Sequence, residues 1–275
     1  MQKLIAILQI KSRRKVDFEM WLKWYIDFIK CDEIYICDDN SEYDLVEIID
    51  RLKKNTNVHY IKMNELDISH ESKSFNRQQK NINVIFKLCK PNQNDIIILP
   101  DDDEFWWFNT SIYNSFKECV NDYRKRFNNI LALYVPWTYM RSKEPLVRRD
   151  KQKNFAECFY YRSNINECPH KPILFYNGPL NTSFHCGYKE GKSITSIGSE
   201  FFKSKCSYTE NLRCYHFRFT TEEEFIEKRK GEISYNYARP YFTTSFVHPI
   251  NDGKTNEDKY DILDKTVLEQ YEKIK

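Results

Sequence analysis

The sequence predicts an α/β protein built on an open, mostly parallel, doubly wound sheet with helices on both faces. Two patterns predict it. Short apolar runs of strand length alternate with amphipathic stretches over residues 1–140, the order typical of β-α-β units. One of these runs, "IIIL" at residues 96–99, is apolar without interruption, as expected of a strand that is covered on both faces.

Each element of this first half follows from its own pattern. "LIAILQI" at residues 4–10 has the length of a strand, and a helix is expected over residues 16–30. An apolar stripe at i, i+3, i+4 and i+7 predicts that helix; it consists of Trp21, Trp24, Tyr25 and Phe28. The other strands are expected near 33–37, 58–63, 96–99 and 130–137, and the other helices near 45–53, 73–90 and 111–127.

The second half predicts a smaller, mixed subregion. Its strand candidates are "ECFYYR" (157–162), "PILFYN" (172–177) and "RCYHFRF" (213–219). Thr220 and Thr221, followed by Glu223 and Glu224, form a helix-capping signal. We expect one domain over residues 1–250, with parts 1–140 and 141–250, and a helical tail over residues 251–275.

Composition narrows the class of protein. The 275 residues are 41% hydrophobic and 16% aromatic, enough for a sizeable core. The 43 basic residues nearly balance the 40 acidic ones, which leaves a net charge of +3. A dedicated nucleic-acid binder carries a concentrated basic patch, so we expect no nucleic-acid partner.

The cysteines and the apolar runs bear on the compartment. Nine cysteines are scattered with no Cys-x-x-Cys pair, which favours reduced core thiols over a zinc site or a disulfide framework. The N-terminal segment does not have the pattern of a signal peptide, and no run approaches the length of a membrane span. We expect a cytoplasmic protein, at most peripheral to a membrane.

No glycine precedes Gly178. A P-loop or a GxGxxG turn needs glycines, because the backbone must turn tightly and approach the phosphates closely. The first half of the chain therefore excludes both devices, and any nucleotide must be bound in another way.

A run of four acids follows the apolar run at residues 96–99. If the strand continues through Asp101 and Asp103, their carboxylates share one side, because side chains alternate with a period of two. Two carboxylates side by side repel unless a cation lies between them, and hard oxygen ligands suit Mg²⁺ or Mn²⁺. The alternative is a solvated acidic loop. Asp38 ends another predicted strand, and ligands of such sheets bind at the carboxyl ends of the strands.

"IILPDDDEFWW" (97–107) resembles the DxD motif of glycosyltransferases with the GT-A fold, and is closest to the family 2-like and family 92-like branch with an Asp-x-Asp-Glu-Phe run. Three further segments agree in order: "DFEMWLKWYIDFIKCDEIYICDDNS" (17–41), "GKSITSI" (191–197) and "CYHFRFTTEEEFIEKRKGE" (214–232). The resemblance spans roughly residues 4–232. "IKSRRKVD" (10–17) departs from it, because the family usually carries Lys-Asn-Glu after the first strand.

The resemblance implies a fold, a cofactor and a set of roles. The first part of a GT-A domain binds the nucleotide and the second part serves the acceptor. A divalent metal, Mn²⁺ or Mg²⁺, would be held by Asp101, Asp103 and His216, with His185 as a second candidate. Asp101 and Asp103 could instead hold the ribose of the donor, and Asp38 would reach its base or ribose. Arg77 could touch the base or the diphosphate, and Lys192 would face the diphosphate. Glu104 would organise the loop. Asp38 could instead serve a turn, and Arg77 and Lys192 could be surface charges.

An inverting transferase also needs a carboxylate that takes the acceptor's proton. The candidates are Asp150, Glu157 and Glu167; Glu157 alternates with aromatics in "FAECFYY". Each could be a surface acid, which would leave a retaining mechanism open. Aromatic side chains could stack on sugars or belong to the core, namely Trp106, Trp107, Trp137 and Tyr139.

These observations lead to three hypotheses of different classes. The first is a metal-dependent, inverting glycosyltransferase that moves a sugar from a UDP-sugar or another nucleotide-diphosphate donor to a hydroxyl of a glycan or glycolipid. The second is a sugar-phosphate nucleotidyltransferase, which usually needs the glycine-rich loop that is missing here. The third is a non-catalytic glycan-binding protein on the same fold.

Overall fold

A computed structural model describes residues 1–11, 14–63, 84–127, 131–142, 146, 148–162, 167–177, 181–182, 187–189, 192–193, 211–217, 221, 223–224 and 262–275. Among the helices of these segments, none is both long and apolar enough to cross a membrane.

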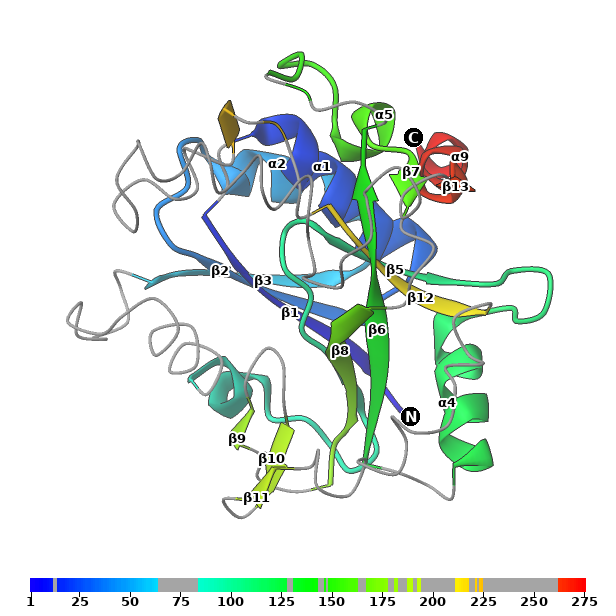
Figure 1. The fold of residues 1–275 in the computed structure, drawn as a ribbon. Coiled ribbons are helices and arrows are strands. Elements are labelled where there is room, and N and C mark those ends of the chain that lie inside the picture. Colours follow the sequence, from blue (N-terminus) through cyan, green and yellow to red (C-terminus); the bar gives the residue numbers. More distant parts are fainter. Residues whose placement is uncertain are drawn as a thin grey trace.

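Four parallel strands form one side of the main sheet, in the order β3-β2-β1-β4, with β3 at the edge (Figure 1). They are β1 (Leu4–Ile10), β2 (Glu33–Asp38), β3 (Asn57–Lys62) and β4 (Ile96–Ile98). Parallel neighbours need a crossover between them. The parallel order predicted for this half of the chain is therefore confirmed.

Helices cover both faces of this sheet, as predicted for a doubly wound fold. Alternate side chains of β1 enter two separate cores: Leu4, Ala6 and Leu8 belong to the first, and Ile5 and Ile7 to the second. The first core contains side chains of α1 (Lys15–Lys23), the π-helix η1 (Trp24–Phe28) and α2 (Leu45–Leu52). The second contains Ile85, Phe86 and Cys89 of the helix over residues 84–89.

The second half extends the sheet with strands of mixed direction. β8 (Glu167–Phe175) lies antiparallel between β4 and β6 (Ala132–Arg141). β12 (Leu212–His216) runs parallel to β6 and antiparallel to β5 (Glu104–Phe108). These strands confirm the predicted runs at 130–137, 172–177 and 213–219 in position. The result is a mixed α/β sheet whose parallel part is N-terminal.

Short elements complete the described chain. At the edge of the main sheet, β7 (Tyr161–Arg162) pairs with β13 (Ile262–Leu263). A separate small sheet contains β9 (Asn181–Thr182), β10 (Gly187–Lys189) and β11 (Lys192–Ser193). The remaining helices are α4 (Phe116–Arg126), α5 (Phe155–Cys158) and α9 (Thr266–Ile274).

The strand expected at 157–162 is wrong in its first part. Phe155 to Cys158 form the short helix α5, and the strand β7 begins only at Tyr161. Asn154 caps α5: its side chain accepts from Glu157 N–H, and the Glu157 carboxylate accepts from Asn154 N–H. This capping box satisfies two N-terminal amides and favours the helix over the strand.

The C-terminal helix α9 packs on the N-terminal half of the chain. Val267 and Tyr271 are buried in the first core, and the α9 backbone ends beside α1, where the Lys23 ammonium donates to Lys275 O at 3.3 Å. The helix predicted in the tail is therefore present over residues 266–274 and shares the main core. The domain boundary at residue 250 stays a prediction.

The cysteines whose side chains the structure describes are free. They are Cys31, Cys37, Cys89, Cys119, Cys158 and Cys214, and all but Cys158 are buried. Burial raises the pKa of the Cys37 thiol to about 12, because an apolar environment disfavours the thiolate. These thiols therefore act as small apolar core groups.

Candidate functional site

Residues 101–104, named here the acid turn, connect β4 to β5. The Glu104 N–H donates to Asp101 O at 3.1 Å, which closes a turn, and β5 begins at Glu104. The expectation that Asp101 and Asp103 alternate along a strand is therefore wrong. β4 ends at Ile98, and Pro100 then offers no N–H to continue a ladder. The acids leave the sheet as a turn, with each carboxylate in a different environment.

The acid turn and Asp38 lie on the same edge of the sheet. β1 pairs in parallel with β2 on one side, with Ile10 opposite Asp38, and with β4 on the other, with Ala6 opposite Ile98. The carboxyl ends of β2 and β4 therefore flank that of β1. Open α/β sheets bind their ligands at this edge, and the structure confirms that both acidic features lie there.

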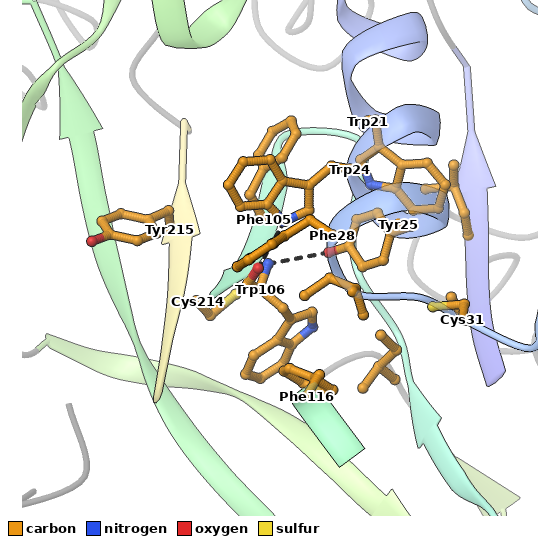
Figure 2. Packing of buried hydrophobic residues seen from close by; sticks show 14 of the residues in the cluster. Trp21, Trp24, Tyr25, Phe28, Cys31, Phe105, Trp106, Phe116, Cys214 and Tyr215 are labelled. Carbon is orange, nitrogen blue, oxygen red and sulfur yellow. Dashed lines mark hydrogen bonds between the residues drawn. The ribbon is translucent and has the colours of Figure 1, made fainter. Parts of the chain in front are cut away.

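Two aromatic side chains of the first helical segment hold the acid turn by its backbone. Trp21 Nε1 donates to Asp101 O at 3.1 Å. The Tyr25 hydroxyl donates to Glu104 O at 3.0 Å and accepts from Trp106 N–H at 3.4 Å (Figure 2). The predicted apolar stripe is thus buried, and its polar atoms position the turn.

Trp24 extends the same arrangement. Its Nε1 donates to Trp106 O at 2.7 Å, and its ring lies edge-on to Phe105 with 5.7 Å between centroids (Figure 2). The helix widens to a π-helix at this point: Ile29 N–H donates to Trp24 O, five residues earlier. Single π-helical turns occur frequently at functional sites.

Lys171 of β8 lies inside the acid turn and is fully buried. Its ammonium donates to Leu99 O at 3.0 Å and to Asp101 Oδ2 at 2.9 Å, and it lies 2.9 Å from Glu104 Oε2. An ammonium has three donors, and three acceptors surround it here. Burial lowers the pKa of Lys171, but the nearby carboxylates of Asp101 and Glu104 outweigh it, so the pKa is raised and the side chain stays charged.

Lys171 was not among the predicted site residues. The signal was a single lysine in the apolar strand "PHKPILF". A lysine is almost never fully buried unless it is paired, so this position pointed to an acidic partner. The partner lies 70 residues earlier in the chain, which only the fold reveals.

The Glu104 carboxyl group has a strongly raised pKa. Its Oε2 accepts from Asp101 N–H at 2.8 Å, as expected of a residue that organises the loop. Burial is the largest effect on its pKa; Lys171 lowers the pKa, Asp101 and Asp103 raise it, and the result is about 8. Within the described residues, Glu104 Oε1 has no hydrogen-bond partner.

His216 lies beside Asp103. Its Nε2 is 3.3 Å from Asp103 Oδ1, and its ring packs against Trp137 and Tyr139, at 4.5 and 5.4 Å between centroids. β12 delivers this imidazole, because His216 pairs with Glu104 in the β5–β12 register. The structure thus brings together two of the three residues that the resemblance implies for a metal.

The described residues do not fit a metal centre. No group of three or more His, Cys, Asp or Glu among them is placed to hold an ion. The Asp101 carboxylate faces the Lys171 ammonium, whereas Asp103 faces His216. Among the described residues, Asp101, Asp103 and His216 are therefore not grouped as ligands of one ion, and their metal role stays a prediction.

The Asp38 carboxylate stabilises a turn by accepting hydrogen bonds. Its Oδ1 accepts from Ser41 N–H at 2.8 Å and its Oδ2 from the Tyr60 hydroxyl at 2.7 Å. The side chain is buried. The turn role that was an alternative for Asp38 is thus present, at the edge where the donor role was predicted.

Two of the three candidate bases have described side chains, and their contacts differ. Asp150 is exposed, and its backbone carbonyl accepts from Arg14 at 2.6 Å, just before the start of α1. Glu157 lies in the α5 capping box, with its Oε1 3.7 Å from the Lys275 ammonium. The idea that Glu157 projects from a strand is wrong.

The remaining predicted residues divide into two groups. Arg77 and His185 lie outside the described residues, and Lys192 and Glu167 are described only as backbone of β11 and β8. Trp106 is fully buried among core side chains (Figure 2) and cannot stack on a sugar. Trp137 and Tyr139 are also buried, against His216. Trp107 is partly buried beneath Arg213, at 5.7 Å.

No protein-family model matches this chain, and no curated protein matches it either. Among solved structures, S. aureus TarS is 14% identical with a TM-score of 0.32, over 54% of this chain and only 23% of that chain. Glucosyl-3-phosphoglycerate synthase from Mycobacterium tuberculosis, in complex with Mn²⁺, UDP and glucosyl-3-phosphoglycerate, is 12% identical with a TM-score of 0.29, over 50% of this chain and 44% of that one.

A third structure, 4-diphosphocytidyl-2C-methyl-D-erythritol synthase, is 13% identical with a TM-score of 0.33, over 64% of this chain and 76% of that one. Similarity this weak does not establish a shared fold or activity.

Proposed function

We propose that this protein is a glycosyltransferase of the GT-A type that moves a sugar from a nucleotide-diphosphate donor, such as a UDP-sugar, to a hydroxyl of a glycan or glycolipid. One observation carries the proposal: Asp38 and the acid turn flank the carboxyl end of β1. Ligands of open α/β sheets bind at this edge, and the donor's hydroxyls are groups that carboxylates bind well.

Asp101 is the acid best placed to meet the donor. About 27% of its side chain is exposed, whereas Asp103 and Glu104 are nearly or fully buried. Lys171 and the Trp21 contact to its backbone hold it in one position. A fixed carboxylate loses little entropy when it accepts hydrogen bonds from a ribose or sugar hydroxyl. Asp103 and His216 would form the wall of the site behind it.

The transfer needs a proton acceptor and a cation for the leaving group. In an inverting reaction the acceptor oxygen bonds to the anomeric carbon, its proton passes to a base, and the diphosphate leaves with the electron pair. Of the three candidate bases, Asp150 is exposed near the start of α1 and is the one we keep. Arg77 and Lys192 would stabilise the developing charge. The metal dependence of the reaction stays a prediction.

A donor screen tests this function. The full chain is incubated with a panel of UDP-, GDP- and CMP-sugars, with and without Mn²⁺, and products are followed by mass spectrometry. We expect turnover of one donor, lost in Asp103→Ala with an unchanged circular dichroism spectrum. Asp50→Ala, an exposed acid on α2, is the control and should retain activity.

Three results would contradict the proposal. One is no binding or turnover of any donor. A second is pyrophosphate release from a nucleoside triphosphate and a sugar phosphate, which identifies a nucleotidyltransferase. The third is glycan binding that Asp103→Ala leaves intact without turnover, which identifies a non-catalytic binder.

A further inference from the structure

The acid turn places several carboxyl groups close together in a poorly solvated place. Asp103 and Glu104 are buried, and Asp101 is mostly buried. Burying even one uncompensated carboxylate is costly, and like charges at short distance increase that cost. The turn therefore needs a cation, and the sequence predicted that this cation is a divalent metal.

We propose that Lys171 takes the place of that metal: its buried ammonium is the resident cation of the acid turn and excludes a divalent ion from it. The geometry supports the substitution directly. Lys171 Nζ lies 2.9 Å from Asp101 Oδ2, an oxygen of one predicted metal ligand, and 2.9 Å from Glu104 Oε2, so it already neutralises the two acids at the ends of the turn. Two cations cannot share these oxygens, because they would lie within a few ångströms of each other.

The lysine is built into the fold. It lies on β8 between two paired strands, with Val135 opposite it on β6, and its third acceptor is the main-chain oxygen of Leu99. A surface lysine can move into solvent, but a fully buried one would leave its own ammonium and the Asp101 carboxylate without their ion-pair partner if it moved. Lys171 is thus a permanent part of the site.

The effect of Lys171 on donor binding rests on the proposed function. A donor bound at Asp101 would be held by hydroxyl contacts, and the cations for its diphosphate would have to come from side chains. Metal binding by the protein alone does not depend on any donor. A test on the metal therefore separates this inference from the proposed function.

The test measures Mn²⁺ binding to the full chain without donor, through the loss of the free Mn²⁺ electron paramagnetic resonance signal. We expect no saturable binding by the wild type at the acid turn. Lys171→Met removes the cation and leaves the acids, and it should gain one saturable Mn²⁺ site. That site should disappear when Asp101→Asn is added.

Because Lys171→Met leaves buried acids unpaired, it could fail to fold. The double variant Lys171→Met with Glu104→Gln removes one charge of each sign and keeps Asp101, Asp103 and His216. It should also gain the site, with a circular dichroism spectrum like that of the wild type. Saturable binding by the wild type that Asp103→Asn abolishes would overturn the proposal, and so would a folded double variant that gains no Mn²⁺ binding.

Discussion

Glu104 and Lys171 show how burial changes the chemistry of single side chains. On a protein surface both would be charged and solvated. Here Glu104 is fully buried beside two other acids, and its pKa rises to about 8. Lys171 is equally buried, yet it stays charged because acids surround it. Burial disfavours the charged form of both residues, but only for Lys171 do the neighbouring charges outweigh it.

The raised pKa of Glu104 predicts a pH dependence of stability. An unfolded glutamate has a pKa near 4.5, so between about pH 4.5 and 8 the folded state holds a proton that the unfolded state releases. The stability from this proton is fully present below pH 4.5 and is lost as the pH rises towards 8. Glu104→Gln cannot titrate, so its stability should improve relative to the wild type over this range.

Urea denaturation of both proteins at a series of pH values measures this difference. Glu47→Gln, an exposed acid on α2, serves as the control and should follow the wild type. If the free energies of unfolding of Glu104→Gln and the wild type run parallel from pH 4.5 to 8, Glu104 keeps its ordinary pKa.

At the scale of the elements, the sequence predicted those strands and helices that have a regular apolar spacing. The strands of the parallel half and the helix with Trp21 and Tyr25 are present, because apolar spacing reflects which face is buried. Two things could not be predicted. The acid run forms a turn, because strand alternation fails where β4 ends. The acids that pair with Lys171 lie in the acid turn, far from it in the sequence. Spacing within one segment does not encode such contacts.

The tyrosine on η1 is expected to stabilise the acid turn. Tyr25→Phe removes the hydroxyl that bridges Glu104 O and Trp106 N–H and leaves both groups without that partner in the core. The expected loss is about 1–3 kcal/mol in the free energy of unfolding. Donor turnover should fall as well, because the turn loses one of its fixed points.

Tyr35→Phe is the matched control for this change. In the wild type, the Tyr35 hydroxyl donates to the Glu33 side chain at 3.1 Å, at the amino end of β2 and away from the acid turn. Denaturant titration and a turnover assay should show a smaller loss of stability and normal activity. Equal effects of the two substitutions on activity would mean that Tyr25 does not position the turn.

At the scale of the whole molecule, one buried ion-pair network ties distant parts of the chain together. Arg149 is almost fully buried and donates to both oxygens of Asp17 on α1, at 2.8 and 2.7 Å. It also donates to Glu224, which Arg14 contacts at 2.9 Å. Three parts of the chain therefore meet around the Arg149 guanidinium: the start of α1, the segment near residue 149 and the helix start near residue 224.

Arg149→Met should destabilise the protein strongly. The substitution leaves the buried carboxylate of Asp17 without its main partner, and breaking a buried pair in this way costs about 3–5 kcal/mol. Arg148→Met is the control, since Arg148 lies in an exposed pair with Glu223 at 3.8 Å; a loss of at most about 1 kcal/mol is expected. Chemical denaturation compares the two. Similar losses would show that the network contributes little.

The most direct test of the donor site is calorimetric titration of the donor selected by the screen, in the presence of EDTA, into wild type, Asp101→Asn and the control Asp50→Asn. We predict that the wild type binds without metal and that Asp50→Asn binds equally well. Asp101→Asn should bind roughly 10- to 100-fold more weakly, as expected for the loss of hydrogen bonds to a charged acceptor. Unchanged donor affinity in Asp101→Asn would contradict a donor site at the acid turn.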